Sequence, residues 1–355
     1  MRALGTDERF SRGVEALKGL AILGIVFYHY DRRLSGVENQ FQWMFGPLPA
    51  SPQEWGYLGA SLFFILSGWG LAYAALGVKN RPELCPAGAV PPLAGDKRER
   101  PLQFFAKRLR RIVPLYYLSV LIFFFGFLIF TSQDLPKLSG QFALKLLFLQ
   151  NVSPETIFSY NSSWWFLGTL VYLYAAYPWL LRAFQRSPDL ALALCLGLGF
   201  ALSHLLALRP VADRHPYLAM GGFPLVKLGE FGFGMWVACV GRSSPKKWLG
   251  LTLLLTAFGL LGLRHPAFYP LHPLGLVAPL LLVAGWIPTL GLARLGVCSY
   301  GLFLFHRPLI DPWLAGLRSF GLGDSAWLAP AIFTILVLAF AVPLERWTQH
   351  VFGRK

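Results

Sequence analysis

"VPLYYLSVLIFFFGFLIF", residues 113–130, contains 18 consecutive residues without a charged side chain. A helix of 18 residues is about 27 Å long. The hydrocarbon core of a bilayer is about 30 Å thick, and a helix needs roughly 20 apolar residues to cross it. The run therefore predicts a membrane-spanning helix and places the chain among membrane proteins.

The composition of the whole chain agrees with this prediction. Of its 355 residues, 55% are hydrophobic and only 14% are charged, whereas a soluble domain carries about 25% charged residues. The net charge of +15 would suit nucleic acid, but in a membrane protein the usual cause is an excess of Lys and Arg in cytoplasmic loops. We expect the lipid bilayer, and no nucleic acid, as a partner.

Similar apolar segments, bounded by charged residues, Pro or Gly, recur along the chain. They predict an all-α bundle of about ten transmembrane helices in one domain, residues 1–355, with the segments at 15–31, 56–77, 112–131, 164–182, 189–208, 219–240, 247–263, 271–288, 295–315 and 326–345. The sixth segment is the weakest, because Lys227 and Glu230 interrupt it.

The distribution of Lys and Arg predicts the orientation. With the N-terminus in the cytoplasm, 22 of the 32 basic residues fall on the inner side and 9 on the outer side, with Lys227 inside a span. This asymmetry predicts cytoplasmic termini and an even number of spans. We expect an irregular cytoplasmic loop at 78–107, a short cytoplasmic tail at 346–355, and an interfacial helix or packed loop at 142–150.

The first apolar segment carries ionisable groups near both of its ends. Lys18 and His29 are separated by ten uncharged residues, and eleven helical steps place them about 20° apart on one face and about 16 Å apart along the axis. Glu15 lies about 40° from His29 on the same face. Lys18 could simply extend toward the surface, but ionisable groups inside a membrane are functional by default.

A basic cluster precedes the charge-free run. Arg108 and Arg111 are three residues apart, so they face the same way and could bind a phosphorylated ligand through their planar guanidinium groups. The same cluster, which includes Lys107 and Arg110, also has the composition of a positive-inside anchor. Charge alone leaves both interpretations open.

Other polar and aromatic residues have weaker patterns. Ser67 and the glycines of 59–73 favour close helix packing. Trp164 and Trp165 fit either an interfacial aromatic belt or stacking on sugar rings, and His306 lies near the outer end of its segment. The four cysteines are scattered and the histidines have no metal-ligand spacing, so we expect no metal site.

Five stretches, in order, resemble the motifs of the acyltransferase 3 superfamily of integral membrane acyltransferases. The family carries an acidic residue followed by R/K-x10-H in its first helix, and Lys18 stands here where Arg is commoner. The matching stretches are VEALKGLAILGIVFYH (14–29), GYLGASLFFILSG (56–68), RLRRIVP (108–114), SWWFLGTLVYLYAAYP (163–178) and SYGLFLFHRPL (299–309). We expect the extracellular hydrolase-like domain that is fused to some members to be absent.

The resemblance implies an acyl-CoA-dependent O-acyltransferase in the inner membrane of a bacterium. Acetyl-CoA or another short acyl-CoA would be the donor, and a hydroxyl of a cell-envelope glycan or lipid-linked sugar the acceptor. Lys18, Arg108 and Arg111 would bind the phosphates of the CoA. His29 would be a general base or an acylated intermediate. Glu15 would hold Lys18 or orient a proton path, and Ser67, Trp164, Trp165 and His306 are candidates for substrate contact.

A membrane transporter or exporter of a small acid or a glycan is the alternative. Ten spans with buried charges would serve it equally well. However, no internal repeat is evident, although many transporters are built from one. The identity of the acceptor and the length of the acyl chain stay open at this point.

Overall fold

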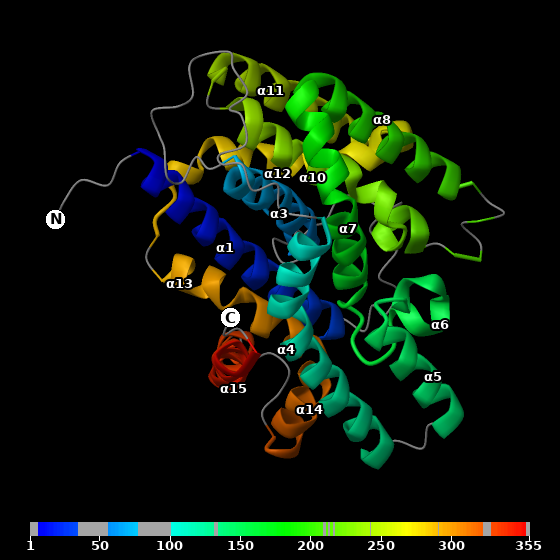
Figure 1. Ribbon diagram of the computed structural model, residues 1–355. Helices are drawn as coiled ribbons and strands as arrows, with labels where there is room; N and C mark the ends of the chain where they lie inside the picture. Colours follow the sequence, from blue (N-terminus) through cyan, green and yellow to red (C-terminus); the bar gives the residue numbers. More distant parts are fainter. Residues whose placement is uncertain are drawn as a thin grey trace.

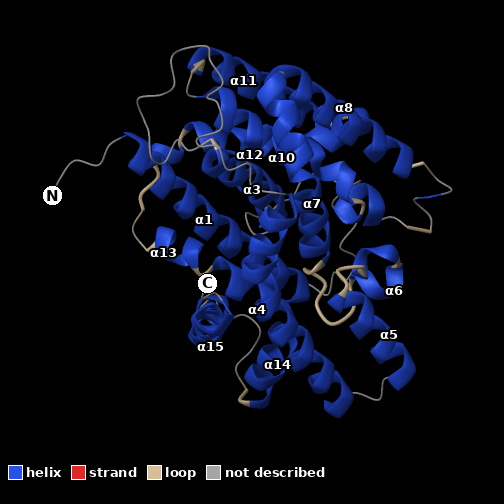
Figure 2. Cartoon of the chain, in the orientation of Figure 1, coloured by secondary structure: helices blue, strands red, loops and turns tan. Residues whose placement is uncertain are grey.

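A computed structural model describes most of the chain as a bundle of helices (Figures 1 and 2). No strand occurs among the described residues, which are 6–34, 56–76, 101–130, 134–208, 211, 214–215, 217–241, 243–289, 291–321 and 328–352. The predicted all-α class is confirmed for this part of the chain.

Each predicted apolar segment contains helix. The helices are α1 (Thr6–Leu34), α3 (Leu58–Ala75), α4 (Pro101–Phe130), α5 (Leu135–Leu146), α6 (Pro154–Ile157), α7 (Trp165–Arg186), α8 (Pro188–Leu206), α10 (Leu228–Trp236), α11 (Pro245–Gly262), α12 (His272–Leu282), α13 (Leu292–Val297), α14 (Ser299–Ser319) and α15 (Ala329–Phe352). Four helices of the described residues, α3, α4, α8 and α15, are long and apolar enough to cross a membrane. The count of about ten spans and the side of the termini stay predictions.

The outward faces of several helices are apolar. Large hydrophobic side chains stand exposed on α4, α8 and α15, among them Ile129, Leu194 and Ile335, each at least 63% exposed. An apolar exterior of this kind is what a helix bundle presents to lipid, so it supports the assignment to a membrane.

The ends of two segments differ from expectation. α4 already begins at Pro101, so 101–107 is helical and does not belong to an irregular loop, while 77–100 lies outside the described residues. Proline at the first helical position has its φ preset for a helix, and Phe104 stacks on Tyr177 with ring centroids 4.6 Å apart. α15 likewise continues into the expected tail, as far as Phe352. In the 142–150 region, α5 is a helix through Leu146.

The sixth predicted segment is broken into short pieces. A wide turn, η4 (Leu218–Gly222), and a single 3₁₀ turn, η5 (Pro224–Lys227), precede α10. Gly221 has φ +127°, a conformation that favours glycine, and Pro224 cannot donate a backbone hydrogen bond. Thr169 and Asn151 donate to the carbonyl oxygens of Gly221 and Gly222, at 2.5 and 3.1 Å. Side chains outside the segment therefore satisfy backbone groups that the break frees.

Glycines let the central helices touch through their backbones. A Cβ on Gly68 of α3 would lie 2.0 Å from the carbonyl oxygen of Phe231 in α10, and one on Gly234 of α10 would lie 1.9 Å from that of Ile65 in α3. α1 packs on α3 through Gly59, and on α13 through Gly19 and Gly296, in the same way. The central position of α1 and α3 (Figure 1) depends on these contacts.

We expect Gly68→Ala to destabilise the protein, by roughly 1–3 kcal/mol, because the added methyl group must push α3 away from α10. Gly70→Ala is the matched control, since a Cβ at Gly70 meets nothing within 4 Å and alanine favours helix by up to about 1 kcal/mol. Thermal unfolding of the two variants in detergent measures the difference. Equal midpoints for the two variants would show that α3 and α10 do not need this contact.

Candidate functional site

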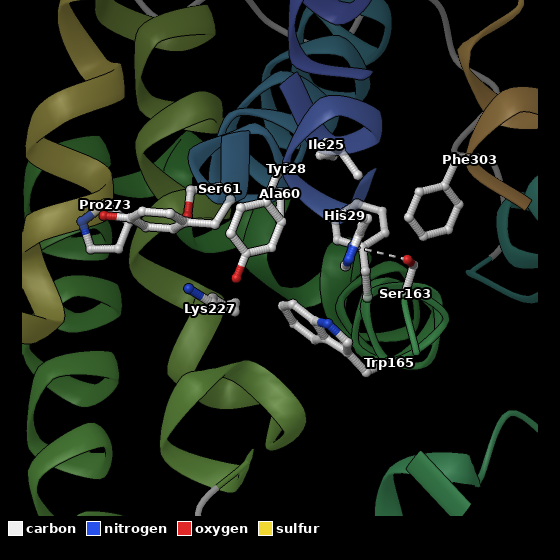
Figure 3. A pocket seen from close by; sticks show the side chains of 12 residues that line it. Ile25, Tyr28, His29, Ala60, Ser61, Ser163, Trp165, Lys227, Pro273 and Phe303 are labelled. Atoms are coloured by element: carbon white, nitrogen blue, oxygen red, sulfur yellow. Dashed lines mark hydrogen bonds between the residues drawn. The ribbon is translucent and has the colours of Figure 1, made fainter. Parts of the chain in front are cut away.

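A pocket lies where α1, α3, α7, η5, α12 and α14 converge (Figure 3). Its empty volume, which includes space open to solvent, is about 680 Å³. The lining residues are Ile25, Tyr28, His29, Tyr57, Ala60, Ser61, Ser163, Trp165, Phe166, Lys227, Pro273 and Phe303. Only His29 and Trp165 among them were candidate site residues from the sequence.

His29 enters the pocket from the last turns of α1 and contacts two other polar side chains. Its Nε2 lies 3.1 Å from the hydroxyl oxygen of Ser163. The same hydroxyl lies 3.5 Å from Nε2 of His306, and the two imidazole rings are 5.4 Å apart between centroids. The structure thus joins His29 and His306, 277 positions apart in sequence, through a serine that the sequence did not single out.

Ser163 is held by the loop that leads into α7. The side chain of Asn161 accepts from the backbone N–H of Ser163 at 2.9 Å and donates to the carbonyl oxygen of Leu304 in α14, also at 2.9 Å. The indole of Trp164 donates to the same carbonyl at 3.3 Å. These contacts fasten the loop to the helix that carries His306, so Ser163 has a defined place between the two histidines.

Trp164 and Trp165 have different environments. Trp164 is fully buried and packs on Tyr116, with ring centroids 5.3 Å apart, so it is neither in an interfacial belt nor in the pocket lining. Trp165 lines the pocket (Figure 3). Of the two tryptophans, Trp165 is therefore the one placed to contact a ligand there.

A buried ion pair lies on the opposite side of the pocket from Ser163. The ammonium of Lys227 is 2.8 Å from Oε1 of Glu230, and the hydroxyl of Ser61 donates to the same oxygen at 2.9 Å. Lys227 and Ser61 line the pocket, and Figure 3 shows both on the other side of Tyr28 from Ser163. In the sequence, the Lys-x-x-Glu spacing of this pair appears only as an interruption of an apolar segment, and that interruption is the signal that could have identified it.

Aromatic side chains form much of the remaining wall. Tyr28 and Tyr57 lie 6.3 Å apart between ring centroids, and the hydroxyl of Tyr57 is hydrogen-bonded to Nε2 of His272. The rings of Tyr57 and His272 are stacked at 5.8 Å. The pocket therefore combines flat apolar faces with a few polar groups, the usual composition of sites that bind organic molecules.

The arginine pair gathers with a different set of residues. Arg108 and Arg111 are both close enough to Tyr174 of α7 to interact with it electrostatically, and Ser67 of α3 is also next to Tyr174. Arg111 interacts electrostatically with Glu345 of α15 as well. The guanidinium group of Arg108 lies 5.4 Å from the ring centroid of Phe104. The expectation that the two arginines face the same way fits this arrangement, which forms a second polar group together with Ser67.

Lys18 and Glu15 form an ion pair, with 2.7 Å between Nζ and Oε1. Both belong to α1, and fourteen residues of helix separate Glu15 from His29 by about 21 Å along the axis. The structure therefore places Glu15 next to Lys18, not next to His29.

Lys145 of α5 packs against the segment that carries Ser163 and leads into α7. It is fully buried, donates to the carbonyl oxygen of Thr156 at 3.1 Å, and lies over the rings of Tyr160 and Trp164 at 5.2 and 5.6 Å from their centroids. Burial lowers the pKa of Lys145 from 10.5 to about 7, because the charged form loses its hydration.

We expect the protein to gain stability as the pH rises from about 7 toward 10.5. In this range the unfolded chain binds a proton at Lys145 that the folded chain does not, a contribution of up to about 1.4 kcal/mol per pH unit. Unfolding midpoints measured between pH 7 and 9 should rise in the wild type and in Lys137→Met, which alters an exposed lysine of the same helix. Lys145→Met should remove this part of the rise, and an unchanged slope would contradict the assignment.

The comparisons with known proteins agree with the sequence motifs. Residues 11–346 match the family described as "Acyltransferase domain". The chain is 21% identical to the peptidoglycan O-acetyltransferase OatA of Listeria monocytogenes over 85% of its length. It is 25% identical over 84% of its length to ORF330 of Acidianus two-tailed virus, an acetyltransferase by assignment only.

The share of the relatives that the chain covers varies. It spans 50% of the Listeria protein and 83% of the viral one. A third relative, YrhL of Bacillus subtilis, assigned as a peptidoglycan O-acetyltransferase, is 24% identical over 45% of this chain and 18% of its own. No solved structure matches the chain.

The family match covers nearly the whole chain, and it includes His29 of α1, the arginine pair of α4 and His306 of α14. The chain therefore belongs to the acyltransferase 3 family of membrane acyltransferases.

Proposed function

We propose that the protein transfers an acetyl or another short acyl group from acyl-CoA to a hydroxyl of a cell-envelope glycan or lipid-linked sugar. The observation that carries this proposal is the pocket itself, in which His29 meets Ser163 and faces a wall with Lys227. A histidine in a mostly apolar pocket is a suitable general base for a hydroxyl.

The donor would bind at the arginine pair. Guanidinium groups bind phosphate through two parallel hydrogen bonds. Arg108 and Arg111 both interact electrostatically with Tyr174, so their charges lie in the same region. The phosphates of acyl-CoA would bind here from the cytoplasmic side, with Lys18 as a further cation. The long pantetheine arm would then carry the thioester to His29.

The acceptor would occupy the aromatic part of the pocket. The faces of Tyr28, Tyr57 and Trp165 could stack on sugar rings, and these side chains line the pocket next to His29. Two of the relatives bear names of peptidoglycan O-acetyltransferases, which supports a glycan of the cell envelope as the acceptor and the inner membrane of a bacterium as the location.

The reaction needs two proton transfers, from the acceptor hydroxyl to His29 and then to the leaving thiolate, and one exchange of bonds. His29 removes the proton of the acceptor hydroxyl while its oxygen attacks the thioester carbonyl. The new ester C–O bond forms, the C–S bond breaks, and the CoA thiolate leaves and takes up a proton. The ammonium of Lys227, held in its ion pair with Glu230, would stabilise the negative charge that develops on the carbonyl oxygen. Transfer through an acylated His29 is the other route, with ping-pong kinetics.

The test is acetyl transfer from radiolabelled acetyl-CoA by the purified full chain in detergent, with bacterial envelope glycan as the acceptor. We expect His29→Ala to lower kcat by about 10²–10⁴-fold, the usual contribution of a general base. Arg108→Ala/Arg111→Ala should raise the KM for acetyl-CoA about tenfold or more, because charge-assisted hydrogen bonds contribute roughly 1.5–3 kcal/mol each.

Arg110→Ala is the matched control, because Arg110 is an exposed cation on the same helix and should leave both constants unchanged. If Arg110→Ala and the double variant change the KM for acetyl-CoA equally, the arginine pair is a membrane anchor and not a binding site for the donor. Full activity of His29→Ala would overturn the role of the histidine, and a wild-type protein that neither binds nor uses acyl-CoA would overturn the proposed donor.

A further inference from the structure

The positions of the protons between His29, Ser163 and His306 follow from their hydrogen-bond partners. Nδ1 of His306 lies 3.1 and 2.9 Å from the carbonyl oxygens of Leu302 and Phe303. Carbonyl oxygens only accept hydrogen bonds, so Nδ1 of His306 carries a proton. In the neutral ring Nε2 then has none, and it can only accept from the hydroxyl of Ser163, 3.5 Å away.

The hydroxyl of Ser163 has a single proton for its two neighbours. If Ser163 donates it to His29, two acceptors face each other at His306 and that bond is lost. If Ser163 donates it to His306, its oxygen can accept from a protonated Nε2 of His29 at 3.1 Å. With both rings neutral, this second arrangement alone makes both hydrogen bonds.

The same arrangement determines which nitrogen of His29 can act as a base. A proton on Nε2 leaves the lone pair on Nδ1, and Ser163 is the one hydrogen-bond partner of His29 within the part of the chain that the structure describes. In the opposite tautomer Nδ1 would carry the proton and Nε2 would be occupied by the serine. His29 would then have no lone pair to offer an acceptor hydroxyl.

We propose that Ser163 and His306 are positioning residues that hold His29 as its Nε2–H tautomer, so that Nδ1 is the atom that takes the proton of the acceptor. This inference rests on the proposed function for what the base does, while the tautomer itself is a property of the resting protein. The role of His306 differs from a direct contact with substrate, because it is fully buried and acts through the serine.

Nuclear magnetic resonance of the ring nitrogens tests the tautomers directly. The full chain, labelled with ¹⁵N-histidine and held in detergent, is measured at about pH 8, above the ordinary pKa of histidine. Loss of signals in His29→Gln and His306→Gln assigns the two rings among the seven histidines. We expect His29 to be protonated at Nε2 and His306 at Nδ1.

Two variants of neighbouring serines separate positioning from folding. Ser163→Ala should turn His29 into a mixture of tautomers and lower kcat for acetyl transfer about 10–100-fold, by analogy with the loss when a residue that orients a metal-ligating histidine is removed. The KM for acetyl-CoA should be unchanged. Ser162→Ala is the control, since the hydroxyl of Ser162 is buried without a hydrogen-bond partner in the described residues. It should retain the wild-type spectrum and kcat.

The outcomes distinguish this inference from the proposed function. His29 protonated at Nδ1 in the wild type, or an unchanged spectrum of His29 in Ser163→Ala, would overturn the inference even if acetyl transfer is observed. The expected tautomers in a protein that transfers no acetyl group would overturn the proposed function and leave the hydrogen-bond assignment standing. A retained Nδ1–H signal of His306 in Ser163→Ala shows that α14 has kept its structure.

Discussion

The contact between the backbones of α1, α3 and α10 is the constraint on which the rest of this structure depends. Gly59, Gly68 and Gly234 bring these helices so close that a methyl group would collide with a neighbouring carbonyl. Inside a membrane the hydrophobic effect does not drive helices together, so close packing has to do so. The contact aligns the end of α1 with the start of α3 and with the turn before α10. His29, Ser61 and Lys227 reach one pocket for this reason.

The polar groups in this apolar interior are stable there because they are arranged in connected sets. Lys227, Glu230 and Ser61 form one set, and His29, Ser163 and His306 form another. An isolated charge in such a place costs several kcal/mol, and a partner with good geometry offsets much of that cost. The helix break before α10 lies next to the first of these sets. Side chains of other segments donate hydrogen bonds to the carbonyl oxygens that the break leaves free. A straight apolar helix at this position would have nothing polar to present to the pocket.

The geometry separates two regions along the bundle. The pocket with His29 is one of them, and the group around Arg108, Arg111, Ser67 and Tyr174 is the other. The proposed acyl-CoA donor, which has phosphates at one end and a reactive thioester at the other, would use such a division, because the binding of its charges and the chemistry would then occur in separate regions. The ion pair of Lys18 with Glu15, about 16 Å of helix away from His29, supports the same division along α1.

The sequence alone determined the helical class, the shared face of Lys18 and His29 and the common direction of Arg108 and Arg111, because these depend only on hydropathy and on the 100° step of a helix. It also identified the family, because its motifs are local and ordered. It predicted neither Ser163 nor the Lys227–Glu230 pair as parts of the site, and it left Trp164 and Trp165 equivalent. These features depend on contacts between segments far apart in the chain, such as the loop before α7 against α14, and on helix ends and breaks such as that at Gly221. Only the tertiary structure decided them, since hydrogen bonds between distant residues leave no periodic pattern in the sequence.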